Sequence, residues 1–205
     1  MRVLPLRGAL PNPFLTEVFP VSSSMLKRLS WTLAAVGLLS GTAVMARPFW
    51  SYPAIKGYGP VHIWPHVAIR PNPHKVYRAL FDVTKPGKSF LRLNPGLSHI
   101  ARAVNTFVAA GVPLSHLRFD VIIHGPATPI ALGPRTFAQV FHHPDPNLRV
   151  IRELRRAGVH IYVCGNALGD MHYTPAEVNP KIKVALSALT TLVIIQNKGY
   201  ALMRM

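Results

Sequence analysis

From residue 76 onward, short apolar runs alternate with segments whose apolar residues recur at helical spacing. The run around Phe119 and Val121–Ile123 is typical of a strand buried on both faces of a parallel sheet. The segment after Asn94-Pro95 instead repeats its apolar residues every three or four positions. Strands that alternate with helices form right-handed βαβ units. We therefore predict one α/β domain over residues 76–205, a three-layer fold with a mainly parallel five-stranded sheet and helices on both faces.

Local signals place the individual elements of this domain. Asn94-Pro95 and Asp145-Pro146 each combine an N-cap residue with proline at the first helical position. Gly111, Gly158 and Gly199 follow predicted helices, where glycine readily adopts the left-handed conformation that ends a helix. The expected strands cover residues 76–83, 117–124, 159–163, about 182–186 and 200–203, and the expected helices begin near residues 95, 146 and 188.

The segment before this domain, residues 47–75, has a different composition. It is rich in proline and glycine, and its aromatic residues include Trp50, Tyr52 and Trp64. Proline at this density disfavours regular helix and favours extended backbone. Aromatic side chains gain free energy by covering apolar surface. We predict an arm that packs along the domain or against a partner subunit.

Residues 25–46 have the pattern of an export signal. Lys27-Arg28 supplies a positive start, Trp31–Val44 an apolar stretch, and Val44-Met45-Ala46 a cleavage site. The apolar stretch is short for a membrane span, and no cysteine follows it to carry a lipid anchor. We expect residues 25–46 to be a signal peptide and residues 1–24 an upstream extension. The remaining chain is then exported, to the periplasm, with no integral membrane segment after signal removal.

The chain is strongly basic, with 23 Lys+Arg against 7 Asp+Glu and a formal net charge of +16. Proteins that follow a phosphate backbone gather basic residues along one surface and interleave them with aromatics. The largest basic group here, Arg149, Arg152, Arg155 and Arg156, lies on one predicted helix and is typical of a solvated helix face. We predict no nucleic-acid partner, and binding to acidic surfaces ranks last among the functions considered.

Motifs for nucleotide, metal or serine-nucleophile chemistry are missing from the sequence. It contains no Walker loop, GxGxxG, GxSxG or HExxH. Gly57-Tyr58-Gly59 has no preceding strand, so it does not read as a phosphate-binding turn. His142-His143 has no companion ligand at a zinc-like spacing, and adjacent residues of a helix point apart. We predict no cofactor and no metal.

The single cysteine, Cys164, is the candidate for chemistry. An exported chain with one cysteine has a thiol that is buried and inert, joins two chains, or is reactive. Cys164 ends a predicted strand, and a short helix is expected to follow from Gly165. Unpaired N–H groups at a helix start favour the thiolate form. His124, at the end of another strand, or His172 could assist as an imidazole, and Asn166 lies just beyond the cysteine. Taken alone, His124 is more typical of a structural histidine that bonds backbone at a turn.

The ordered set of these elements resembles the DsrE/DsrF-like family, in its exported, single-domain subgroup. The resemblance covers about residues 76–203 and rests on Val76–Thr84, Asn94–Leu97, Val121–Gly125, Val159–Leu168 and Ala188–Ala201. It implies a five-stranded, mainly parallel fold and homo-oligomers, either trimers or hexamers. In the sulfur-relay members, the cysteine that ends the third strand accepts a persulfide sulfur and passes it on, and Cys164 matches that position. Those members also carry an arginine-glycine pair further on, where this chain reads Gly169–Tyr173.

Two hypotheses of function follow from these observations. The first is an exported DsrE-like protein that carries or transfers sulfane sulfur as a persulfide on Cys164, at most a sulfur carrier or transferase with a donor or acceptor protein as partner. The second is a non-catalytic protein of the same fold that binds a small ligand at the strand ends or forms an oligomer through its arm. A buried Cys164 sulfur would favour the second hypothesis.

Overall fold

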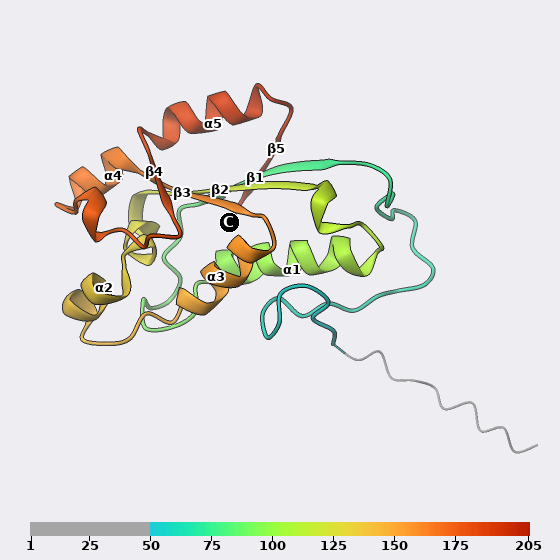
Figure 1. The fold of residues 1–205 in the computed structure, drawn as a ribbon, viewed down its shortest axis with the longest axis horizontal. Coiled ribbons are helices and arrows are strands. Elements are labelled where there is room, and N and C mark those ends of the chain that lie inside the picture. The colour runs from blue at the N-terminus through green and yellow to red at the C-terminus, as the bar shows by residue number, and fades with distance from the viewer. Residues whose placement is uncertain (1–49) are drawn as a thin grey trace, which may run out of the picture. The chain divides into compact units, whose positions relative to one another are not determined.

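The structure is a computed structural model, and it describes residues 50–205. The predicted signal peptide at residues 25–46 and the predicted extension at residues 1–24 lie outside the described residues. All described residues belong to one compact unit. At its centre is a five-stranded sheet with the strand order β4-β3-β2-β1-β5, in which every neighbouring pair is parallel (Figure 1).

The predicted elements form with small shifts at their ends. The strands are β1 (Tyr77–Val83), β2 (Leu117–Ile123), β3 (His160–Cys164), β4 (Lys183–Ala185) and β5 (Ala201–Arg204). The α-helices of the described residues are α1 (Pro95–Ala109), α2 (Pro134–Phe141), α3 (Leu148–Arg156), α4 (Gly165–Asp170) and α5 (Ala188–Gln196). Short 3-10 helices cover Leu114–His116, Gly125–Ala131 and Pro175–Glu177.

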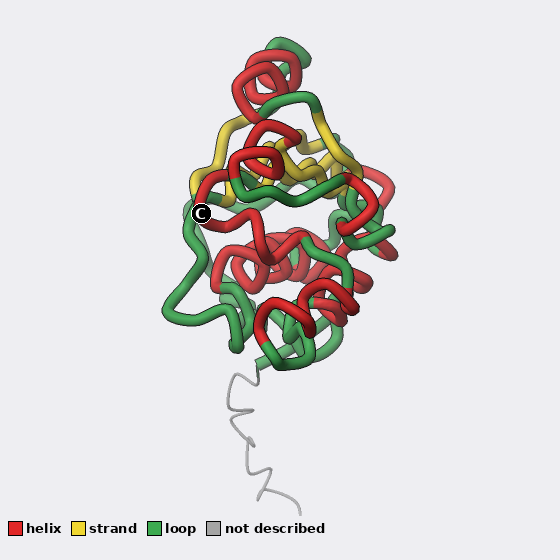
Figure 2. Tube along the Cα trace, turned by 90° about the vertical axis from the view of Figure 1, so that its left-hand side faces the viewer, coloured by secondary structure: helices red, strands yellow, loops and turns green. Residues whose placement is uncertain are grey.

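Helices cover both faces of the sheet (Figures 1 and 2). The chain moves from β1 through β2 to β3 in one direction, and right-handed crossovers then keep α1 and α3 on the same face. From β4 the chain returns to β5 at the opposite edge of the sheet. Because this last crossover runs across the sheet in the opposite direction, the same right-handedness puts α5 on the other face of the sheet. The predicted three-layer α/β fold is therefore confirmed.

Each face of the sheet has its own apolar cluster. Phe81 and Val121 pack in the cluster that also contains α1 and α3 side chains. Their chain neighbours Leu80 and Ile122 pack in the second cluster, with Ile195 of α5. Successive residues of a strand point to opposite faces, so both faces are buried. This explains why the strands appear in the sequence as continuous apolar runs.

One predicted helix start is wrong. Asp145-Pro146 does not open α3, which begins at Leu148 with Asn147 as its N-cap residue. The Asp145 side chain instead accepts hydrogen bonds from the backbone N (2.8 Å) and the Nδ2 (3.0 Å) of Asn147. Asn147 Oδ1 in turn accepts from the backbone N of Asn94 at 2.8 Å. This bond joins the starts of α1 and α3, and no local sequence pattern indicates it. The short helix α2 was also not predicted.

The described part of the arm packs on α1. Its first half is closed by an antiparallel bridge between Ser51 and Val61. The side chain of Asn105, which is fully buried in α1, holds this half. The Asn105 amide bonds five backbone groups of the arm: it accepts from Ala54 N at 3.0 Å and Ile55 N at 2.7 Å, and it donates to Ile55 O at 3.4 Å, Tyr58 O at 2.9 Å and Gly59 O at 2.9 Å.

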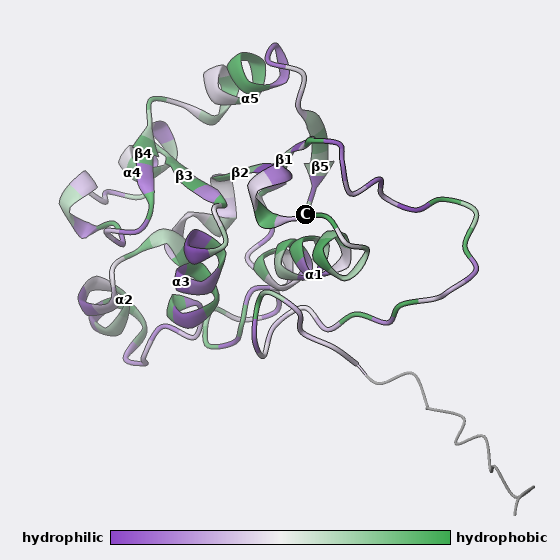
Figure 3. Ribbon diagram, turned by 45° about the vertical axis from the view of Figure 1, so that its right-hand side comes forward, coloured by the Kyte–Doolittle hydropathy of each residue, from purple (hydrophilic) through white to green (hydrophobic). Residues whose placement is uncertain are grey.

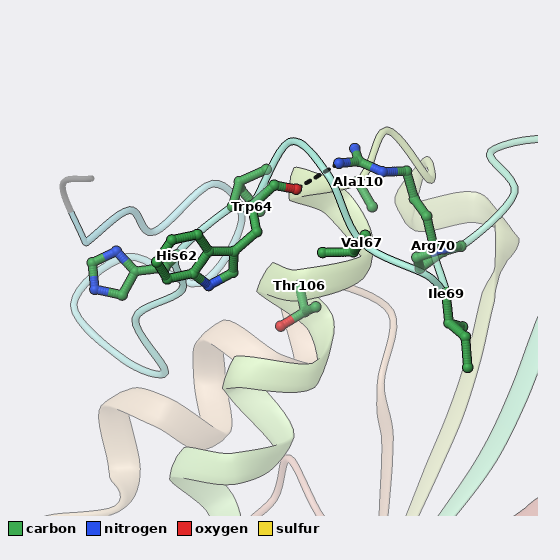
Figure 4. Close-up of a pocket in the computed structure, with 9 residues that line it drawn as sticks. His62, Trp64, Val67, Ile69, Arg70, Thr106 and Ala110 are labelled. Carbon is green, nitrogen blue, oxygen red and sulfur yellow. Dashed lines mark hydrogen bonds between the residues drawn. The ribbon is translucent and has the colours of Figure 1, made fainter. Parts of the chain in front are cut away.

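Beyond residue 61 the arm lies over the end of α1 and leaves a cavity of about 180 Å³ (Figure 4). Arg70 closes this part of the arm, because its Nη2 donates to the carbonyl oxygens of Trp64 (2.7 Å) and Pro65 (3.2 Å). Trp64 and Ile69 remain largely exposed. The first half of the arm is therefore part of the domain, and the second half presents apolar side chains to solvent.

Candidate functional site at the carboxyl edge of the sheet

Cys164 lies where the sequence predicted, as the last residue of β3 and the N-cap residue of α4. Its side chain enters the apolar cluster on the α5 side of the sheet and is 5% exposed. The Sγ atom accepts hydrogen bonds from the backbone N of Ala167 at 3.4 Å and of Ala188 at 3.2 Å. The first turns of α4 and α5 thus both direct an N–H group at this sulfur.

Close backbone packing brings the start of α5 to the cysteine. A Cβ atom at Gly165 would lie 2.9 Å from the carbonyl oxygen of Ala185, so glycine allows β4 to approach α4. Ser187 is the N-cap residue of α5, and its side chain accepts from Leu189 N at 3.2 Å. Because the Ser187 side chain bonds Leu189 N, the Ala188 N–H group remains able to donate to the sulfur of Cys164.

A paired histidine and aspartate lie beside the cysteine. His124 follows β2, and its Nε2 lies 2.7 Å from Oδ1 of Asp82 in β1. An ionised carboxylate only accepts hydrogen bonds, so Nε2 carries the proton and Nδ1 is an acceptor in the neutral ring. Ile122 is the register partner of Tyr162. Continued by two residues, that register sets His124 beside Cys164 on the same face of the sheet.

The other predicted site residues, Asn166 and His172, lie in and just after α4. Asn166 is exposed in α4. His172 follows α4 with φ 58°, and its backbone N bonds Gly169 O at 3.0 Å. Among the hydrogen bonds of residues 50–205, neither side chain reaches Cys164. Of the predicted assisting residues, strand register sets only His124 beside the cysteine, and its side-chain hydrogen bond goes to Asp82 and not to the sulfur.

Sequence reasoning missed two members of the site, Asp82 and the Ala188 N–H group. Asp82 carries a weak signal, because it is the one acidic residue within the apolar stretch Leu80–Val83. Ala188 carries none, since it contributes a backbone group from a segment 24 residues away in the chain. Only the packed structure brings these groups together.

A second Asp–His pair occurs at the opposite end of the same sheet face. His160 Nδ1 lies 3.0 Å from Oδ1 of Asp120, near the amino end of β3. Burial raises the pKa of Asp120, although the charges of His160 and Lys198 oppose that shift. Ligands of open α/β sheets bind at the carboxyl ends of the strands. The Asp120–His160 pair lies at the other end of the strands, so its substitution can serve as a control for substitution of the Asp82–His124 pair.

Neither a metal-binding cluster nor a membrane-spanning helix occurs in the described part of the chain. Within residues 50–205, no three His, Cys, Asp or Glu side chains gather as a metal site would require. The same residues contain no helix with both the length and the apolar character needed to cross a bilayer.

Comparisons with known proteins identify the family of this chain. No match was found among curated proteins. One similar solved structure is a protein of unknown function from Methanobacterium thermoautotrophicum, with a TM-score of 0.46 and 17% sequence identity. That comparison covers 63% of this chain and 99% of the other. The profile of the DsrE/DsrF-like family matches residues 78–205, which is more than half of the chain. The chain therefore belongs to the DsrE/DsrF-like family.

Proposed function

We propose that this protein carries sulfane sulfur as a persulfide on Cys164. Membership of the DsrE family suggests a role related to sulfur relay. The observation that carries the finer proposal is the pair of backbone N–H groups, from Ala167 and Ala188, that contact the Sγ atom. Hydrogen bonds from N–H donors stabilise negative charge on sulfur and so favour the nucleophilic thiolate.

The chemistry requires no external oxidant or reductant. The Cys164 thiolate attacks the outer sulfur of a donor R–S–SH; the new Sγ–S bond forms as the S–S bond of the donor breaks, and R–S⁻ leaves. Transfer to an acceptor thiolate reverses this step and returns the negative charge to Sγ. The two N–H groups then stabilise the leaving thiolate. They therefore support both uptake and release.

His124 supplies an acid–base group for this exchange. Asp82 holds the proton on Nε2, which leaves Nδ1 to take the proton of the incoming S–H group. Asp82 acts through His124 and is a positioning residue. The low exposure of Cys164 restricts the donor to small molecules or requires the turn before α5 to open.

Mass spectrometry of the intact protein after exposure to inorganic polysulfide tests the proposal. We expect the wild-type chain to gain sulfur atoms that a reductant removes, and Cys164→Ala to gain none. Peptide mapping should place the added sulfur on Cys164. A folded wild-type protein that stays unmodified would contradict persulfide carriage.

The second candidate is a non-catalytic ligand-binding or assembly protein, and two observations favour it. Cys164 is buried, as an inert structural thiol would be. Helix α5 is mostly apolar along its length (Figure 3), and its side chains Leu189, Val193 and Ile194 are exposed. Homo-oligomers, trimers or hexamers by family resemblance, would cover such a face. Light scattering decides this: Val193→Glu should lower the oligomeric state, and a wild-type monomer would exclude assembly.

A further inference from the structure

The carboxyl ends of β1 and β5 border a cavity of about 350 Å³. Its walls come from the loop after β1, the start of α1 and the end of β5. In this part of the sheet, the helix that follows β1 covers one face and the helix that precedes β5 covers the other. Open α/β sheets bind ligands at the carboxyl ends of neighbouring strands whose connecting helices lie on opposite faces of the sheet. The lining residues are Lys85, Gly87, Pro95, Gly96, His99, Arg204 and Met205.

The side chains of this cavity are basic. Lys85, His99 and Arg204 come from three separate segments, and no Asp or Glu lines the cavity with them. Among residues 50–205, none of the three forms a salt bridge. Asp82 is the register partner of Arg204, but its carboxylate pairs with His124. Lys85 and Arg204 therefore bring two permanent positive charges to the cavity, and in the described structure the α-carboxylate of Met205, which also lines it, forms no salt bridge with either.

The start of α1 shapes the cavity but does not supply its donors. Asn94 Oδ1 already accepts from the backbone N of Gly96 (2.9 Å) and of Leu97 (3.2 Å). A Cβ atom at Gly96 would lie 3.2 Å from Cβ of Met205, so glycine lets the end of β5 approach α1. The positive character of the cavity thus comes from its side chains.

Another basic cavity in the described residues has an explanation that needs no ligand. Its volume is about 290 Å³, and Arg152, Arg155, Arg156 and Lys181 line it. Glu153 contacts Arg152 and Arg156, at 3.5 Å and 3.0 Å, and neutralises part of this charge. Arg155 and Arg156 also lie in the last turn of α3, where basic residues compensate the helix dipole. The cavity between β1 and β5 has no such salt bridge and no basic residue in the last turn of a helix, and the α-carboxylate of Met205 is the negative group on its lining.

We propose that the cavity between β1 and β5 binds a small dianion that carries a phosphate or sulfate group. Arginine and lysine are the usual partners of such groups, and the side chains of Arg204 and Lys85 can both donate hydrogen bonds to their oxygen atoms. The cavity opens beside α1, whereas the Cys164 sulfur lies on the α5 side of the sheet. The site is therefore separate from the persulfide site and does not depend on it.

Calorimetric titration of the full chain with inorganic phosphate, and then sulfate, at constant ionic strength tests this proposal. We expect saturable binding that weakens about tenfold, or about 1.4 kcal/mol, in both Lys85→Gln and Arg204→Gln. Lys88→Gln removes the same charge from the same loop outside the cavity, and it should bind phosphate like the wild type. Thermal unfolding without phosphate checks that each variant is folded, and Lys85 lies in an exposed loop where substitution is tolerated.

Two results would overturn the site: no saturable phosphate or sulfate binding by the wild type, or an equal loss in Lys88→Gln, which would indicate diffuse charge attraction. Vesicles of phosphatidylcholine with phosphatidic acid distinguish the source of the anion. Binding of free phosphate without vesicle binding assigns a soluble ligand. Vesicle binding that depends on Lys85 assigns a lipid phosphate held by the same side chains.

Discussion

At the residue scale, the reactivity proposed for Cys164 depends on the few atoms that surround its sulfur. The backbone N–H groups of Ala167 and Ala188 are fixed by the starts of two helices, and substitution of their side chains leaves the donors in place. His124 is different, because a side-chain substitution removes its imidazole. The role of this histidine can therefore be tested directly.

We predict that His124→Gln slows sulfur uptake by Cys164 about a hundredfold, the usual contribution of a positioned acid–base group. The rate can be followed by mass spectrometry in a polysulfide time course. His160→Gln breaks the second Asp–His pair, at the amino end of the sheet face, and is the matched control. It should react at the wild-type rate. Equal slowing in both variants would assign His124 a structural role only.

Asp145 gives a prediction for the pH dependence of stability. Burial raises its pKa above the ordinary value of 3.8, despite hydrogen bonds from Asn147, and its Oδ2 is buried without a partner in the described structure. The folded state therefore holds this proton to higher pH than the unfolded state. The contribution of Asp145 to the free energy of unfolding falls as the pH rises from about 3.8 through the folded-state pKa.

Asp145→Asn removes the ionisable group but keeps an oxygen that accepts from Asn147 N. We expect the variant to be more stable than the wild type at pH 7, and the advantage to disappear at pH values below 3.8. Urea unfolding at a series of pH values measures this difference. An advantage that does not change with pH would show that Asp145 ionisation has no part in it.

At the scale of elements, the arm and α1 behave as one packed unit because of Gly59. A Cβ atom at Gly59 would lie 2.1 Å from the backbone N of Arg102, and the residue has φ +57°. Gly57 has a similar backbone conformation, with φ +81°, but its added Cβ would meet nothing within 4 Å. A substitution at either glycine strains the backbone, but only one at Gly59 also brings a Cβ atom against α1. Comparing the two therefore separates the cost of backbone strain from the cost of steric contact.

We predict that Gly59→Ala lowers the free energy of unfolding by about 3 kcal/mol, because it displaces the arm and breaks the Asn105 hydrogen bonds. Gly57→Ala should cost only about 1 kcal/mol, the strain of a left-handed residue. Chemical denaturation of both variants provides the comparison. Equal costs would mean that contact between the arm and α1 adds little to stability.

At the scale of the whole molecule, we propose that the chain is exported to the periplasm and that residues 25–46 are removed. The charge, apolar length and cleavage pattern of this segment support the proposal. N-terminal sequencing of the protein from the periplasmic fraction should give a mature chain that begins near Arg47. A protein that is recovered there with residues before Met25 still attached would contradict cleavage at this site.

The fold was predictable because its signals are local. The apolar runs of the strands, the Asn94-Pro95 cap and the glycines after the helices act over a few residues, and they located all five strands and α1. Handedness then decided which face each long crossover helix covers. The start of α3 was misplaced because the Asp145 side chain bonds Asn147, whose own side chain bonds Asn94, 53 residues away, and α3 begins only at Leu148. Tertiary contact overrode the local signal of Asp145-Pro146.

The sequence alone determined that Cys164 ends a parallel strand and precedes a helix, since alternation of local patterns is sufficient for that conclusion. Only the tertiary structure decided what surrounds the sulfur. The Ala188 N–H group reaches it across 24 residues, and the Asp82–His124 pair forms across 42 residues. Contacts at such separations depend on strand order and register, which no local pattern encodes. The same is true of the basic cavity, where Lys85 and Arg204 become neighbours because β5 pairs with β1.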